Sequence, residues 1–132
     1  MIKFDNNIFY LQTRNTTYSF GVLDNRLLLH LYWGKRIYFV PKNVMDNYYK
    51  RNLMAFDCGK YSSDGLPLEY STFGSADLRL PTFGAVYSDG SRITKLLYKD
   101  YNITNGKPQI KGLPSTYCEE NDTVLGQEGK DI

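Results

Sequence analysis

Residues 8–33 read IFYLQTRNTTYSFGVLDNRLLLHLYW, and this stretch decides the fold. It holds three apolar segments, which are separated by Arg14-Asn15 and by Asp24-Asn25. The middle segment alternates small or polar residues with large apolar ones, a period of two that is typical of a half-buried strand. Asp and Asn tolerate the left-handed backbone angles of tight turns. The stretch therefore predicts a strand pair or meander. Its predicted strands are residues 8–13, 16–23 and 27–33.

The rest of the chain continues this pattern with one long interruption. Residues 41–52 are polar and rich in tyrosine, with weak helical spacing, and residues 56–83 are broken by glycine, proline and serine. Loops of that length are uncommon in compact domains and are often functional. Further strands are predicted after it, with Asp89-Gly90 as a hairpin turn. These strands are residues 83–87, 92–103, 115–119 and 123–125.

The predicted fold class is all-β: an antiparallel β-sandwich with a long irregular central loop. No segment of about 10 residues carries the apolar stripe of an amphipathic helix. Residues 126–132 (GQEGKDI) show no structural pattern, so the sequence is expected to stop within a domain. Residues 1–132 are therefore interpreted as part of one β-sandwich domain.

Composition excludes several classes of protein. Lys and Arg number 16 against 14 Asp and Glu, and this net charge of +2 is scattered, which argues against nucleic acid as a partner. No apolar run approaches the ~20 residues that cross a bilayer, so no membrane partner is expected. The N-terminus lacks the pattern of a signal peptide, and the expected location is cytoplasmic. Aromatic residues make up 15%, with 12 tyrosines, which favours β-structure and offers flat faces for sugars or proteins.

The residues offer little reactive chemistry. With two cysteines and one histidine, no metal site is predicted, and no cofactor is expected. His30 is the sole candidate base, and strand alternation places it on the same face as Leu28 and Tyr32, which favours a structural role. The central loop holds four carboxylates, but closeness in sequence does not fix the separation that glycoside hydrolysis requires. No catalytic residue is therefore assigned. The four carboxylates are Asp57, Asp64, Glu69 and Asp77.

Three blocks of sequence resemble the glycoside hydrolase family 36 α-galactosidases. Residues 21–35 are similar to the opening strands of that family. Residues 63–70 (SDGLPLEY) and 73–81 (FGSADLRLP) resemble its SLDTLPQEY and YGTGDFRxP motifs. Residues 89–98 and 106–117 resemble its NGSRITDLRY and GKPxLxGLPATY motifs. The blocks occur in the family's order and spacing over most of residues 9–120.

The resemblance implies an N-terminal β-sandwich domain of an enzyme that hydrolyses terminal α-linked galactose from melibiose- or raffinose-type oligosaccharides with retention. In the family, both catalytic aspartates lie in a following barrel domain, so this chain alone is expected to be inactive. Bacterial members are often tetramers in which a long loop of this domain reaches a neighbour's active site. A homo-oligomer is therefore expected here, with residues 53–64 as that loop. Its candidate pocket residues by position are Asp57, Lys60, Tyr61 and Asp64.

Six residues match the family motifs well, and they have two interpretations. They line the substrate entrance or a subunit contact, or they are structural, with Asp/Glu–Arg pairs and packed aromatics holding the loop. These residues are Trp33, Asp64, Glu69, Tyr70, Asp77 and Arg79.

Three functions follow as rival hypotheses. The first is a non-catalytic domain that serves assembly and shapes the substrate pocket of an α-galactosidase. The second is a stand-alone carbohydrate-binding module, which the tyrosine content suggests. The third is a structural β-domain whose resemblance is ancestral only.

Overall fold

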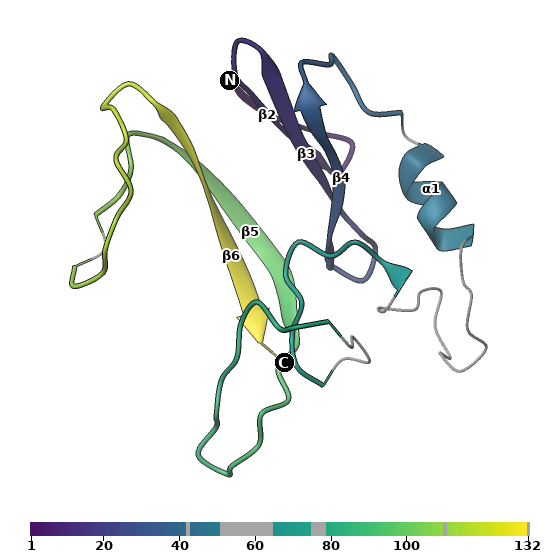
Figure 1. Ribbon diagram of the computed structural model, residues 1–132, viewed down its shortest axis with the longest axis vertical. Helices are drawn as coiled ribbons and strands as arrows, with labels where there is room; N and C mark the ends of the chain where they lie inside the picture. Colours follow the sequence, from purple (N-terminus) through teal and green to yellow (C-terminus); the bar gives the residue numbers. More distant parts are fainter. Residues whose placement is uncertain (42, 51–64, 75–78, 110, 132) are drawn as a thin grey trace.

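The computed structural model describes residues 1–41, 43–50, 65–74, 79–109 and 111–131. The first four strands form one antiparallel sheet in the order β1-β2-β3-β4, which confirms the predicted meander (Figure 1). The first strand was not predicted. It pairs with the second through a tight turn in which Asn6 and Asn7 both have positive φ, a conformation that asparagine tolerates. The strands are β1 (Ile2–Asp5), β2 (Ile8–Gln12), β3 (Thr16–Val22) and β4 (Leu28–Lys35).

A β-bulge interrupts the pairing of β3 with β4. Ser19 lies opposite Tyr32, whereas the next residue, Phe20, lies opposite His30, so Leu31 is an extra residue on β4. An extra residue reverses the faces of the side chains that follow it. The prediction that His30 and Tyr32 share a face is therefore wrong.

The second sheet is a ribbon of two antiparallel strands, β5 (Leu96–Asn105) and β6 (Thr123–Asp131). The sequence pattern predicts a last strand that ends at residue 125 and no structure for residues 126–132. In fact β6 continues to Asp131 and pairs with β5 along its whole length, because pairing with β5 satisfies the backbone of this polar segment.

Two of the predicted strands are wrong. Residues 83–87 and 115–119 are not strands, because they have no ladder partner; Phe83 alone forms an isolated bridge, with Thr72. The Asp89-Gly90 turn is present, and Gly90 takes the positive φ of 82° that the turn requires. The predicted irregular loop is confirmed for its described residues, 65–74 and 79–83, which contain isolated bridges rather than strands.

One short helix, α1 (Asn43–Lys50), lies within the segment of weak helical spacing. Met45 on α1 is buried against the four-stranded sheet, where its sulfur lies near Gly21 of β3. Among the described residues, no helix is long and apolar enough to cross a membrane. In the described part of the chain, the regular structure is thus mostly antiparallel strands with almost no helix, as predicted.

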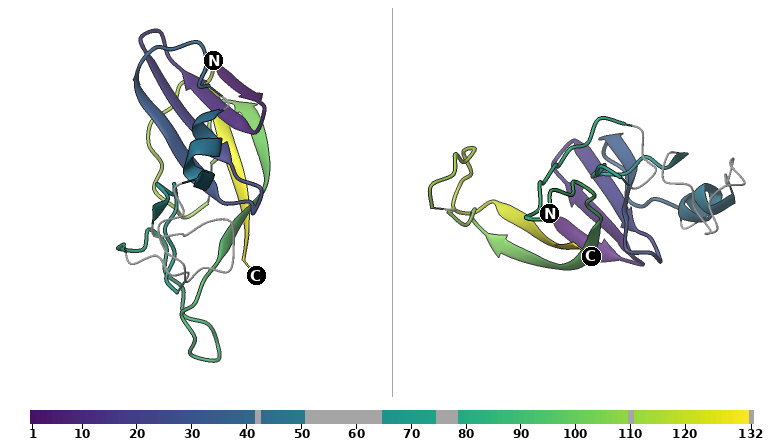
Figure 2. Two further views of the ribbon diagram at one scale, coloured as in Figure 1. Left: turned by 90° about the vertical axis from the view of Figure 1, so that its right-hand side faces the viewer. Right: turned by 90° about the horizontal axis from the view of Figure 1, so that it is seen from below.

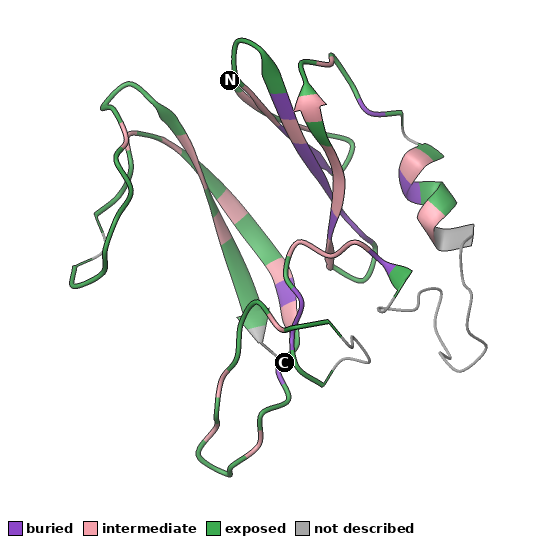
Figure 3. Ribbon diagram, viewed as in Figure 1, coloured by how far each residue is buried: buried purple, intermediate pink, exposed green. Residues whose placement is uncertain are grey.

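The four-stranded sheet is the middle layer, with α1 on one side and the β5–β6 ribbon on the other (Figures 1 and 2). Each face carries its own apolar cluster, and Figure 3 shows that burial concentrates on β2 and β3. The face toward α1 is built around Ile8, Tyr10 and Leu29. The face toward the ribbon is built around Phe9 and Phe20, against which Tyr98, Tyr101 and Leu125 pack.

Candidate functional site

The described part of the central loop is attached to the beginning of β4. The amide of His30 donates to the carbonyl of Pro67 at 2.7 Å, and the amide of Glu69 donates to the carbonyl of Leu28 at 3.0 Å. Between them, Leu68 forms an antiparallel bridge with Leu29. The LPLEY motif therefore extends the four-stranded sheet by a short piece of backbone beyond β4.

The side chain of Glu69 makes a second attachment, on the sheet face that looks toward the ribbon. The Tyr18 hydroxyl donates to Oε2, and His30 Nδ1 lies 3.0 Å from Oε1. An ionised carboxylate only accepts hydrogen bonds, so His30 donates from Nδ1. The Glu69 side chain is 16% exposed, so this carboxylate is largely removed from water and depends on its two donors.

The surroundings of the Tyr18 phenol change its pKa. Burial raises the pKa of Tyr18 well above its ordinary value, and the hydrogen bond to the Glu69 carboxylate raises it further. A neutral hydroxyl is the form that donates, so Tyr18 stays a donor to Glu69 throughout the neutral range.

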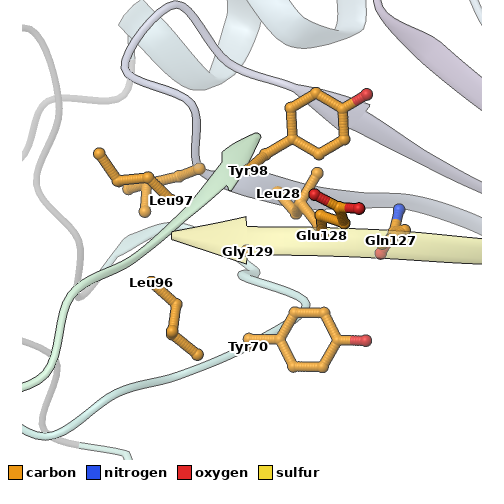
Figure 4. A pocket seen from close by; sticks show the side chains of 9 residues that line it. Leu28, Tyr70, Leu96, Leu97, Tyr98, Gln127, Glu128 and Gly129 are labelled. Atoms are coloured by element: carbon orange, nitrogen blue, oxygen red, sulfur yellow. The ribbon is translucent and has the colours of Figure 1, made fainter. Parts of the chain in front are cut away.

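Tyr70 follows Glu69 and lines two adjoining cavities between the sheets, of about 160 and 190 Å³, and Figure 4 shows the smaller of them. Gln127 of β6 also lines both, and its Nε2 atom is buried without a hydrogen-bond partner. The larger cavity contacts Tyr18 and Glu69. The smaller is mainly apolar, and its lining includes Leu28, Leu96, Leu97 and Tyr98.

The structure brings together two of the predicted site residues, Glu69 and Tyr70. Trp33 lies on β4 directly opposite Tyr18, and its side chain is 77% exposed. Arg79 is exposed, and it follows residues 75–78, which are not described. Five predicted residues lie outside the described part of the chain: Asp57, Lys60, Tyr61, Asp64 and Asp77.

Three residues of the site were not predicted to belong to it: Tyr18, His30 and Gln127. The alternation of β3 places Tyr18 on the same face as Phe20, and His30 pairs across from Phe20, so a shared face was predictable. Their convergence on Glu69 was not, because Glu69 is 39 and 51 residues away. No group of three His, Cys, Asp or Glu side chains suited to a metal occurs among the described residues.

Comparison with known proteins agrees with this fold. Residues 26–131 match the family model described as the glycosyl hydrolase family 36 N-terminal domain. The chain is 34% identical over 128 residues to alpha-galactosidase Mel36A of Lactobacillus acidophilus, a match that covers 92% of this chain and 18% of the relative. It is 33% identical over 117 residues to alpha-galactosidase AgaA of Geobacillus stearothermophilus, covering 84% of this chain and 16% of that protein.

Solved structures give the same result. The crystal structure of the GH36 alpha-galactosidase AgaB from Geobacillus stearothermophilus matches 99% of this chain with a TM-score of 0.80 and 30% identity. The galactosidase domain of the alpha-galactosidase-sucrose kinase AgaSK matches the same share with a TM-score of 0.82 and 30% identity. The chain spans less than a fifth of these relatives, 18% and 19% of the two solved chains. The chain therefore belongs to glycoside hydrolase family 36, as the N-terminal domain found in its α-galactosidases.

Proposed function

We propose that this domain is the non-catalytic part of an α-galactosidase that hydrolyses terminal α-linked galactose from raffinose- or melibiose-type oligosaccharides. In that role it shapes the entrance to the substrate pocket and takes part in subunit contacts of a homo-oligomer. Support comes from its relatives: Geobacillus AgaA variants were crystallised in complex with raffinose and with stachyose.

The observation that carries the proposal is the double attachment of the LPLEY segment. Backbone hydrogen bonds to β4 and the two side-chain bonds to Glu69 hold this segment on the sheet. Tyr70 is thereby presented on a fixed backbone with half of its side chain exposed. A rigidly held aromatic with a polar tip suits contact with a sugar or with a neighbouring subunit.

The other predicted residues keep their proposed roles. Trp33 and Arg79 are exposed, as a role at the substrate entrance or in a subunit contact requires. The loop residues Asp57, Lys60, Tyr61 and Asp64 remain candidates for the contact with a neighbour's pocket, and Asp77 remains a candidate for the substrate entrance or a subunit contact.

The test is a chimera in which this chain replaces the matching N-terminal segment of Geobacillus AgaA. We expect raffinose hydrolysis by the chimera and none by the isolated chain, because we expect the catalytic aspartates to lie elsewhere in the enzyme. Tyr70→Ala in the chimera is expected to raise KM for raffinose, and Tyr117→Ala, which removes an exposed tyrosine of the remote loop, is the matched control. Turnover by the isolated chain, or an unchanged KM in the Tyr70→Ala chimera, contradicts the proposal.

Exposed aromatic side chains support a second candidate, a carbohydrate-binding module. Trp33, Tyr38 and Phe39 all lie at or just beyond the end of β4 with more than half of each side chain exposed. Titration of the isolated chain with galactose, melibiose and raffinose tests this function. Absence of binding at millimolar sugar rules it out.

A further inference from the structure

We infer that Glu69 is a positioning residue that sets the place of Tyr70 through Tyr18 and His30. This inference deepens the proposed function, on which its role in substrate binding rests. The attachment itself is a property of the chain and is testable without any enzyme activity.

Tyr70 lies between two anchor points. On its N-terminal side, Glu69 is bound to β3 and β4 through side chain and backbone. On its C-terminal side, the Ser71 hydroxyl donates to the carbonyl of Leu80 at 2.9 Å, and the amide of Thr82 donates to the carbonyl of Ser71 at 2.9 Å. The backbone of Tyr70 is therefore fixed on both sides, while its ring is free to line the cavities.

The two anchors differ in kind. The Ser71 anchor joins two parts of the same loop, so it does not by itself place the loop on the sheet. The Glu69 anchor crosses from the loop to two strands, at separations of 51 residues to Tyr18 and 39 to His30. Of the side-chain contacts that hold Tyr70, those of Glu69 therefore determine where the ring stands relative to β4 and β6.

A carboxylate suits the chemistry of this anchor. Tyr18 and His30 both present donors, and an ionised carboxylate can accept from both at once. Glutamine has the same shape but one acceptor oxygen, so one of the two donors would face an NH2 group. The NH2 group can bond only if Tyr18 or His30 turns to accept from it, and the negative charge on the acceptor is lost. Glu69→Gln therefore keeps the volume of the side chain and weakens the anchor, whereas Tyr18→Phe removes the Tyr18 hydrogen bond outright.

Amide hydrogen exchange followed by NMR measures the attachment in the isolated chain. Glu69→Gln and Tyr18→Phe are each expected to speed exchange at the Glu69 amide about tenfold or more, the factor expected for losing a hydrogen bond to a charged group. Exchange at Phe9 in β2 is expected to stay unchanged. The matched controls are Glu120→Gln and Tyr117→Phe, at exposed positions.

Enzyme kinetics of the chimera then separate positioning from general stability. Glu69→Gln and Tyr18→Phe are expected to raise KM for raffinose severalfold with kcat unchanged within about twofold. The substrate and the transition state would lose the same binding interaction, and the catalytic step, which takes place elsewhere, would be unaffected. A loss of fold would lower kcat per mole of protein instead.

The outcomes distinguish this inference from the proposed function. If Tyr70→Ala raises KM but Glu69→Gln and Tyr18→Phe do not, Tyr70 contributes and the positioning role is wrong. Unchanged exchange at the Glu69 amide in both variants also overturns it, whatever the kinetics. If the exchange rises and Tyr70→Ala leaves KM unchanged, the anchor is real and the proposed function fails.

Discussion

Two tyrosines of this domain, Tyr18 and Tyr98, have a raised pKa. Burial raises the pKa of Tyr18, and it also raises the pKa of Tyr98, where Asp100 adds to the effect. Unfolded tyrosines ionise near pH 10. A raised pKa in the folded state means that the associated stability is complete below that pH and is lost as the pH rises further.

We therefore expect the free energy of unfolding to fall above about pH 10. Tyr18→Phe should make this decline shallower, and denaturant unfolding between neutral and alkaline pH measures it. A spectrophotometric titration provides the check: the step at the ordinary pKa should have the same amplitude in the variant as in the wild type. A smaller step would show that Tyr18 ionises normally.

Phe9 is the central residue of the face between the sheets. It is fully buried, and its ring centroid lies 4.3 Å from that of Phe4 and 4.9 Å from that of Phe20. Phe9→Ala should lower the free energy of unfolding by about 3–5 kcal/mol, which is enough to unfold a small domain. Thermal or urea unfolding measures the effect, and Tyr38→Ala, at a position 91% exposed, should change stability by less than about 0.5 kcal/mol.

At the scale of elements, the contact of α1 with the sheet depends on a missing side chain. A Cβ atom on Gly21 would lie 2.9 Å from the sulfur of Met45 and 3.2 Å from Leu31 Cδ1. Gly21→Ala should therefore force the ends of the Met45 and Leu31 side chains to move and cost about 1 kcal/mol, at the low end for an overpacked core. Urea unfolding of a double-mutant cycle with Met45→Ala measures the coupling. Additive effects of the two substitutions would show that the close approach is relieved elsewhere.

Much of the first sheet could be predicted from sequence, because it depends on local pattern. Alternation and asparagine-rich turns located β2, β3 and β4 within two residues of their ends. The second sheet was harder, because Gly126 to Asp131 has no apolar pattern and becomes a strand only through pairing with β5.

The bulge on β4 and the partners of Glu69 could not be predicted from the sequence, because both depend on contacts between distant residues. Nothing in the sequence LLHLYW marks Leu31 as an extra residue, since only the register against β3 reveals it. Glu69 and Tyr70 were selected because they belong to a matched motif. Their partners are far away in sequence, and alternation predicts the face of a strand residue but not what docks on it.

At the scale of the whole molecule, the arrangement leaves strand edges available. Among the described residues, β5 and β6 form a ladder only with each other (Figure 1), although the Tyr98 amide of β5 also donates to the carbonyl of Arg26. Unpaired edges are templates for association with another chain. This arrangement supports the proposed homo-oligomer.

We expect the isolated chain to self-associate as its concentration rises, and sedimentation velocity measures the average mass. Ile103→Lys places a charge on β5 and should reduce the association, whereas Leu113→Lys, in the exposed loop beyond β5, should not. A chain that stays monomeric at every concentration would argue against assembly through this domain.

The bulge on β4 also affects the tryptophan fluorescence of this protein. Trp33 is the sole indole in the sequence, and the extra residue before it places it on the same face as Tyr18, where it is 77% exposed to water. Its emission in the native state should already resemble that of free tryptophan, so denaturation will shift the spectrum little. The same emission should move to shorter wavelength when a second molecule covers β4, which makes Trp33 a natural optical probe of docking.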